Sequence, residues 1–267
     1  MRTCLNLVTL QRGFDTLQGI AIAAKAGFGG VGIWADSLES QASPVEYAKQ
    51  VAKAAADSGL RVEEMCFVGG WMWAEGEDRQ KAFEAIRRRV EIAAAAACPL
   101  VIACASGGTG EIAAAAEDFR QVCEIGREHG ISFALEYIGA FPQIKDIPSG
   151  LEVVRAADHP NGKLLIDIFH TFRGGSPAED FKLPQGKEVG LVHMNDVPAG
   201  DLGQMNDSHR VMPGAGVLPL TECLSNLRAK GYDGALSVEV FSQDWWQRPA
   251  EETAAAAFAG LSKVIPA

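Results

Sequence analysis

The sequence predicts a (β/α)8 barrel, an α/β fold in which eight parallel strands alternate with helices in a single domain of residues 1–267. Short apolar runs typical of buried strands alternate along the chain with amphipathic stretches typical of helices. The 267 residues also divide into about 33 residues for each expected strand and its helix, the size of one unit of such a barrel. Hydrophobic residues form 48% of the chain, enough for a full core.

Eight runs carry the strand pattern, in which branched and aliphatic side chains are bounded by glycine or polar residues. They are residues 3–9, 30–34, 61–68, 100–105, 132–138, 163–169, 190–195 and 235–241. An open, doubly wound sheet is the alternative arrangement of alternating strands and helices. That fold usually has fewer strands, and no GxGxxG motif follows the first expected strand. The closed barrel is therefore the preferred prediction.

Glycines mark the ends of several expected helices, each just before a new strand. They are Gly27, Gly59, Gly130 and Gly231. The residue after a helix often adopts a left-handed conformation that glycine tolerates best, so we expect positive φ angles there. Ser43 and Pro44 predict a helix start, because serine can cap free amides and proline fits the first turn. A further helix is expected over residues 77–96, where apolar side chains recur at helical spacing.

The chain carries 34 acidic and 24 basic side chains, which gives a formal net charge of −10. This charge opposes binding to nucleic acid, whose phosphates attract clustered lysine and arginine. No segment approaches the roughly 20 consecutive apolar residues that a membrane-spanning helix needs. The six cysteines are scattered without a CxxC pair, which favours reduced, buried thiols. We therefore expect a cytoplasmic protein with neither a nucleic-acid nor a membrane partner.

Polar side chains interrupt four consecutive expected strands, each near its C-terminal end: Glu136, Asp167, His193 and Glu239. Taken singly, a buried acid is more often satisfied by a basic side chain or an amide, and a strand histidine by a hydrogen bond. The four residues together favour a different interpretation, because closure of the barrel directs all of them to one place at the rim, where barrel enzymes build their sites. Buried carboxylates are costly without a cation. The pattern predicts one divalent metal ion, Mn²⁺, Mg²⁺, Co²⁺ or Zn²⁺.

A resemblance to a known family rests on five segments. They are 134–139 (Ala-Leu-Glu-Tyr-Ile-Gly), 167–170 (Asp-Ile-Phe-His), 192–196 (Val-His-Met-Asn-Asp), 210–216 (Arg-Val-Met-Pro-Gly-Ala-Gly) and 237–241 (Ser-Val-Glu-Val-Phe). These segments resemble the xylose-isomerase-like TIM-barrel superfamily of sugar isomerases, epimerases and AP endonucleases of family 2. Within it, the chain is most similar to inosose (2-keto-myo-inositol) isomerases, which share the Arg-x-x-Pro-Gly loop and the Ser-Val-Glu strand. The resemblance covers the C-terminal half well and the N-terminal half in outline.

The resemblance implies roles for six residues of this chain. Glu136, Asp167, His193 and Glu239 would bind the metal ion, and the two glutamates would also act as catalytic residues that transfer a proton. His170 and Arg210 would contact the substrate. Without the resemblance, His170 would be expected to form a hydrogen bond at a strand end, and Arg210 to be a surface charge on a turn.

Aromatic residues gather at or after the second and third expected strands: Trp34, Phe67, Trp71 and Trp73. We expect them to line a substrate pocket, with Trp34 and Phe67 in contact with the substrate. Packing within the loops and a contact between subunits are equally open interpretations.

The resemblance implies a metal-dependent isomerase or epimerase that moves a proton through an enediolate of a small polyhydroxy ketone, in sugar or inositol catabolism. A dehydratase of inosose or 3-dehydroshikimate and a hydroxypyruvate isomerase are alternatives with the same ligands. A nuclease of this fold holds three zinc ions, which five histidines and a charge of −10 disfavour. A sugar-binding barrel without activity would not need both glutamates. The expected partner is a small polyol or ketose, and a homo-oligomer is left open.

Overall fold

A closed barrel of parallel strands forms the centre of the molecule in the computed structural model, which describes residues 1–266. Within these residues the eight strands are β1 (Arg2–Asn6), β2 (Gly30–Trp34), β3 (Arg61–Val68), β4 (Leu100–Cys104), β5 (Ser132–Glu136), β6 (Gly162–Asp167), β7 (Val189–Met194) and β8 (Ala235–Val238). They pair in sequence order, and β8 pairs with β1 to close the barrel. The prediction of a (β/α)8 barrel is confirmed.

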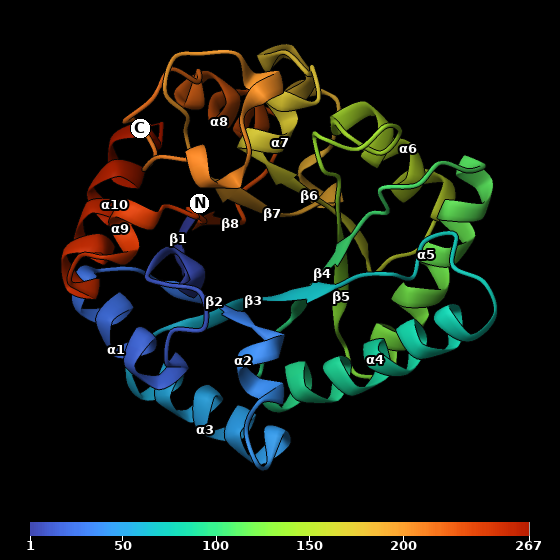
Figure 1. Cartoon of the computed structure of the whole chain (residues 1–267), viewed down its shortest axis with the longest axis horizontal. Helices are drawn as coiled ribbons and strands as arrows, with labels where there is room; N and C mark the ends of the chain where they lie inside the picture. The colour runs from blue at the N-terminus through green and yellow to red at the C-terminus, as the bar shows by residue number, and fades with distance from the viewer. Residues whose placement is uncertain (267) are drawn as a thin grey trace.

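Helices surround the barrel as an outer ring (Figure 1). The longer ones are α1 (Thr16–Ala26), α3 (Pro44–Asp57), α4 (Gly76–Ala95), α5 (Ile112–Arg127), α6 (Ile147–Ala157), α8 (Leu220–Ala229) and α10 (Ala250–Val264). Shorter elements lie in the connections: α2 (Ala35–Glu39), α7 (Ile168–Arg173), α9 (Gln243–Trp246), η1 (Leu7–Thr9), η2 (Ala178–Lys182), η3 (Gly186–Glu188), η4 (Leu202–Gln204) and η5 (Asp207–His209). Across residues 1–266, no helix is both long and apolar enough to cross a bilayer.

The expected helix boundaries are largely confirmed. Positive φ angles occur at Gly27 (97°), Gly59 (70°), Gly130 (69°) and Gly231 (85°). Helix α3 begins at Pro44, but the Ser43 side chain forms no capping hydrogen bond, contrary to expectation. Helix α4 begins and ends one residue before the predicted range 77–96.

Several strands end earlier than the sequence pattern predicts, because the chain leaves the sheet at the rim of the barrel. Strand β6 ends at Asp167, whose carboxylate accepts a hydrogen bond from the amide of His170 at 2.8 Å and so caps α7. His170 is therefore helical and not the last part of a strand. Strand β1 likewise ends at Asn6, whose side chain caps η1 by accepting the amide of Val8.

The interior of the barrel is a compact apolar cluster contributed by strands alone. Its buried members are Cys4, Cys66, Leu100, Ile102, Ala134, Leu165, Leu191 and Ala235. A larger cluster packs the helices onto the outer surface of the strands. Burial raises the pKa of the Cys4 and Cys66 thiols well above the usual value, so both remain protonated.

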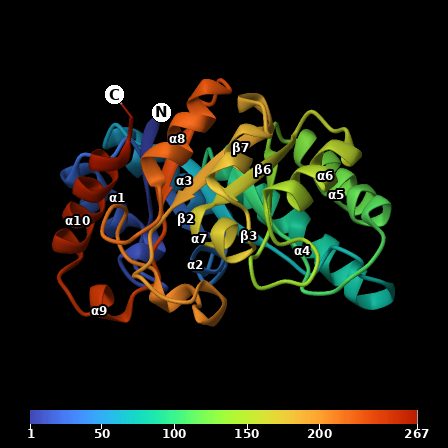
Figure 2. The ribbon, with the colours of Figure 1, turned by 90° about the horizontal axis from the view of Figure 1, so that it is seen from above.

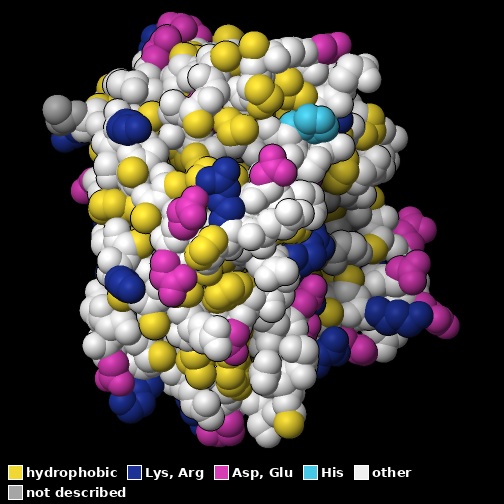
Figure 3. Space-filling model, turned by 60° about the vertical axis from the view of Figure 1, so that its left-hand side comes forward, with side chains coloured by type: hydrophobic (Ala, Val, Ile, Leu, Met, Phe, Trp, Pro, Cys, Tyr) yellow, Lys and Arg dark blue, Asp and Glu magenta, His cyan; other side chains and the backbone are white. Residues whose placement is uncertain are grey.

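The two ends of the barrel differ in what they carry. Figure 2 shows both chain termini at one end, and α2, α7 and α9 at the other, where the strands finish. The polar residues singled out by the sequence lie at this second end, as the (β/α)8 fold requires of a catalytic rim. On the face shown in Figure 3, Lys and Arg side chains are interspersed with Asp and Glu and form no continuous basic patch.

Replacing Leu165 with alanine should lower the free energy of unfolding by about 2–5 kcal/mol, because it opens a cavity inside the closed barrel. The matched control is Leu183→Ala, since Leu183 is 44% exposed while Leu165 is fully buried. Urea denaturation of both variants measures the difference. Equal losses of stability would contradict the placement of Leu165 in the barrel interior.

Candidate metal centre

Four polar side chains from neighbouring strands converge at the rim. Glu136 ends β5, Asp167 ends β6, His193 lies in β7 and Glu239 directly follows β8. The Nδ1 atom of His193 lies 3.5 Å from Glu136 Oε1, 3.8 Å from Asp167 Oδ2 and 3.2 Å from Glu239 Oε2. One potential ligand atom from each residue lies within 4.8 Å of all the others. The structure thus brings together the four side chains that the sequence singled out.

The orientation of His193 fits a bound cation. Its Nδ1 atom is buried and has no hydrogen-bond partner within residues 1–266, although it faces the three carboxylates. Its Nε2 atom lies 2.7 Å from Glu64 Oε2. A carboxylate that accepts Nε2–H leaves the lone pair on Nδ1 free, as in many metal-binding histidines. One imidazole nitrogen and carboxylate oxygens form a ligand set for Zn²⁺, Mn²⁺ or Co²⁺, so the residues fit one divalent ion.

Glu64 is a buried residue of this centre that sequence reasoning missed. Its Oε1 atom accepts hydrogen bonds from Ser237 Oγ at 2.6 Å and from Asn6 Nδ2 at 3.1 Å. A side chain at Gly32 would place its Cβ only 2.3 Å from Glu64 Oε1, so the glycine makes room for the carboxylate. A signal existed in the sequence: Glu63 and Glu64 are adjacent in an apolar strand, where successive side chains face opposite sides. One of them therefore has to enter the barrel.

A second grouping of Glu64, Cys66 and His193 also lies within metal-binding distances. There, however, the Nε2 atom of His193 already bonds to Glu64, and burial keeps the Cys66 thiol protonated. The side of His193 that carries Nδ1 is thus the better candidate for an ion.

Arg210 extends into the carboxylate cluster and is almost fully buried. Its Nη1 atom donates hydrogen bonds to Asp167 Oδ2 at 2.9 Å and to Glu239 Oε2 at 2.8 Å. Its Nη2 atom donates to Asp207 Oδ1 at 2.6 Å and lies 3.1 Å from His170 Nε2. The alternative of a surface charge on a turn is therefore wrong for Arg210. Its guanidinium belongs to the centre and stabilises two of the candidate ligands.

Asp196, to which the sequence analysis assigned no role, holds the loop that carries Arg210. Its carboxylate accepts the amides of Gly214 at 3.2 Å, Gly216 at 3.0 Å and Leu218 at 3.0 Å. Its backbone also pairs with Val211 in an isolated antiparallel bridge. These bonds fix both sides of the turn that follows Arg210.

The carboxylates of the centre differ in their affinity for protons. Burial raises the pKa of Glu136 to about 7, and the nearby His193 offsets only part of this effect. Burial also acts to raise the pKa of Glu239, but the charges of His193 and Arg210 outweigh it, so the pKa is lowered. Burial acts to lower the pKa of His193, yet Glu239 and Glu64 raise it well above the usual value. The guanidinium of Arg210, paired with Asp167 and Glu239, thus offsets part of the negative charge of this arrangement.

A cavity of about 270 Å³ opens beside the centre. Its lining includes Trp34, Phe67, Cys104, Glu136, Ile138, His170, Arg210, Glu239 and Phe241. Trp34 and Phe67 thus lie where the sequence analysis expected a substrate pocket. Trp71 does not, because it is buried against Phe119, with ring centroids 5.9 Å apart. Trp73 binds the backbone of Glu111 and also lies outside this cavity.

Replacing Glu64 with alanine should weaken zinc binding by roughly 10- to 100-fold, because His193 loses the partner that orients its ring. The matched control is Glu63→Ala, since Glu63 points out of the barrel and binds Arg2 at 2.9 Å. Isothermal titration with Zn²⁺ measures both dissociation constants, and circular dichroism checks that each variant is folded. Equal affinities for the two variants would contradict the role of Glu64.

Comparison with known proteins places the chain among related sequences. A family model described as xylose isomerase-like TIM barrel matches residues 20–264. An inosose isomerase from Halalkalibacterium halodurans is 36% identical over 134 residues, which cover 49% of this chain and 47% of the relative. A 3-dehydroshikimate dehydratase from Pseudomonas aeruginosa is 31% identical over 252 residues, which cover 92% of this chain and 38% of the relative. The chain therefore spans about half, or less, of the length of these curated relatives.

Solved structures share the fold of the chain. A crystal structure of an IOLI protein with a bound zinc atom superimposes with a TM-score of 0.88 at 20% sequence identity. The alignment covers 99% of this chain and 98% of that protein. At this identity the likeness establishes the common barrel.

Proposed function

The chain belongs to the xylose isomerase-like TIM barrel family, and on that premise we propose that it is a divalent-metal-dependent isomerase or epimerase of a small polyhydroxy ketone. One observation carries the proposal: two glutamates, Glu136 and Glu239, flank His193 in a single buried centre that fits one cation. A centre that only bound a sugar would not need paired carboxylates beside a potential metal ligand. The inosose isomerase and 3-dehydroshikimate dehydratase relatives support an enzyme of this kind.

The two glutamates divide the proton transfer. The metal ion, when bound, would polarise the carbonyl and the adjacent hydroxyl of the substrate and so acidify the C–H bond between them. One glutamate takes this proton, which leaves an enediolate, and a glutamate returns a proton to the substrate. Delivery to the neighbouring carbon gives isomerisation, and delivery to the opposite face of the original carbon gives epimerisation. β5 and β8 lie on different sides of β7, so Glu136 and Glu239 reach the substrate from different directions.

The surrounding residues orient the carboxylates and line the cavity. Arg210 keeps Asp167 and Glu239 oriented through its two hydrogen bonds. His170 and Arg210 both line the cavity, and we propose that they contact hydroxyl groups of the substrate. Trp34 and Phe67 form an apolar wall of the same cavity and limit the access of water.

A dehydratase is the second candidate function, and the length of one match favours it. The match to the 3-dehydroshikimate dehydratase extends over 92% of this chain, whereas the match to the inosose isomerase covers 49%. The same enediolate can expel a β-hydroxyl group as water instead of taking a proton back. Both functions therefore begin with the same proton removal at the same centre.

Proton exchange in D₂O tests this shared step. Protein loaded with Mn²⁺ or Zn²⁺ should incorporate deuterium next to the carbonyl of at least one ketone in a panel of inososes, ketohexoses, hydroxypyruvate and 3-dehydroshikimate, as followed by NMR. The products distinguish isomerase, epimerase and dehydratase. Glu239→Gln should slow exchange by at least about 100-fold, because the amide cannot take the proton. The control Glu251→Gln alters an exposed acid on α10 and should behave like the parent.

Removal of the metal tests the dependence on a cation. Treatment with a chelator should abolish exchange and lower the thermal midpoint, because an ion that binds only the folded state stabilises it. Addition of Mn²⁺, Co²⁺ or Zn²⁺ should restore both properties. Full exchange in the demetallated protein would rule out the metal-dependent mechanism.

A further inference from the structure

The cavity beside the metal centre is lined by a cation that has no partner of its own. Arg12 lies in the connection between η1 and α1, and its side chain helps to line the cavity together with Glu136 and Glu239. Within residues 1–266, Arg12 forms neither a hydrogen bond nor an ion pair. Its guanidinium instead contacts two aromatic rings: the Cζ atom lies 6.0 Å from the ring centroid of Trp34 and 5.8 Å from that of Phe241.

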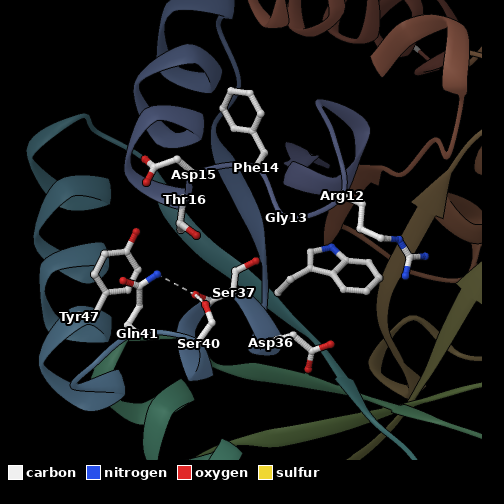
Figure 4. A pocket seen from close by; sticks show the side chains of 11 residues that line it. Arg12, Gly13, Phe14, Asp15, Thr16, Asp36, Ser37, Ser40, Gln41 and Tyr47 are labelled. Atoms are coloured by element: carbon white, nitrogen blue, oxygen red, sulfur yellow. Dashed lines mark hydrogen bonds between the residues drawn. The ribbon is translucent and has the colours of Figure 1, made fainter. Parts of the chain in front are cut away.

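Two acidic side chains that share the adjoining cavity with Arg12 are engaged elsewhere. Asp15 and Asp36 line a neighbouring cavity of about 370 Å³ that Arg12 also borders (Figure 4). Asp15 accepts the amide of Gln18 at 2.8 Å as the cap of α1, and Asp36 pairs with Arg89 at 2.5 Å. In Figure 4 the guanidinium of Arg12 points away from the side of this cavity formed by Tyr47 and Gln41. Arg12 is exposed to solvent, and neither of these acids neutralises its charge.

The rings of Trp34 and Phe241 connect Arg12 to the centre through a series of contacts. Trp34 donates its Nε1–H to Asn6 Oδ1 at 2.7 Å, and Asn6 Nδ2 in turn donates to Glu239 Oε1 at 3.3 Å. The Trp34 ring packs edge-on against Phe241, with centroids 6.1 Å apart. Phe241 also carries the guanidinium of Arg210, whose Cζ lies 5.4 Å from the ring centroid. Both arginines thus contact the Phe241 ring, but Arg210 is bonded to Asp167, Glu239 and Asp207, whereas Arg12 is bonded to no carboxylate within residues 1–266.

The cavity is small enough that a molecule bound in it would reach both the metal centre and Arg12. About 270 Å³ is just below the range of roughly 300–1,000 Å³ that is usual for small-molecule sites. A molecule that fills this space and presents its carbonyl to the centre between Glu136 and Glu239 must also approach the wall that carries Arg12. A neutral hydroxyl would not need a guanidinium there, whereas a carboxylate matches its fork of N–H donors.

We propose that Arg12 binds a carboxylate group of the substrate, so that the enzyme acts on a carboxylate-bearing hydroxy ketone and discriminates against neutral sugars and inososes. The inference rests on the proposed function of the centre and names the substrate class. A carboxylate fits better than a phosphate monoester, because one guanidinium balances one negative charge. A dianion would add further charge beside the buried carboxylates of the centre.

Kinetics with paired substrates test the proposal. The metal-loaded parent should exchange the α-proton of 3-dehydroshikimate with a kcat/KM at least about 100-fold higher than that for 2-keto-myo-inositol or fructose 6-phosphate. Arg12→Met should raise KM for the acid by roughly 10- to 100-fold with little change in kcat, the loss expected for one charged hydrogen-bonding partner. Arg12→Lys should recover part of the loss. The control Arg248→Met removes another arginine stacked on a tryptophan, since Arg248 Cζ lies 4.3 Å from the Trp245 centroid.

Direct binding separates failure of this inference from failure of the proposed function. Shikimate carries the carboxylate but no ketone, so its binding to the metal-loaded protein, measured by calorimetry, does not require turnover. Shikimate binding that is lost in Arg12→Met and kept in Arg248→Met supports the subsite even if no ketone exchanges its proton. A preference for the neutral or the phosphorylated ketone, an Arg12→Met variant that equals the parent, or no binding of shikimate would each overturn the assignment.

Discussion

The concentration of negative charge at the rim is the constraint on which the rest of the site depends. Asp167, Glu64 and Glu239 are buried at the end of an apolar barrel, a position that is costly for unpaired carboxylates. His193 lies between Glu64 and the other acids: one ring nitrogen bonds to Glu64, and the other faces Glu136, Asp167 and Glu239. This bond between a buried acid and an imidazole sets the direction in which the centre can accept a cation.

Two loops bring arginine side chains to this negatively charged rim. The loop after β7 is tied down by Asp196, and it inserts Arg210 between Asp167 and Glu239. On the opposite side, Asn6 at the end of β1 links Glu239 to the Trp34 ring, and that ring carries Arg12. The paired guanidinium stabilises the centre, while the unpaired one remains available to a ligand. The same residue type thus compensates charge at one place, and in our proposal selects the substrate at the other.

The alternation of apolar strands and amphipathic helices predicted the fold, because a barrel repeats one strand–helix unit. Particular residues in the sequence mark where each unit ends. The glycines at 27, 59, 130 and 231 end their helices with positive φ as expected. Strand ends were predicted less well, since side chains such as Asp167 terminate the strand by capping the next turn. Trp71 and Trp73 were expected beside the pocket, but packing against Phe119 and a bond to Glu111 hold them elsewhere. Loop packing of this kind leaves no periodic signal.

The sequence by itself determined the barrel and the four polar residues that meet at its rim, because position along a strand translates directly into depth in a closed sheet. Only the tertiary structure decided how those residues are supported and what faces the cavity. Glu64 and Asn6 act through contacts over long distances in the chain, such as the one between Glu64 and His193 across 129 positions. Likewise, whether an arginine is paired depends on which acids the fold brings near it. The fold leaves Arg12 exposed and unpaired, whereas it buries Arg210 among carboxylates.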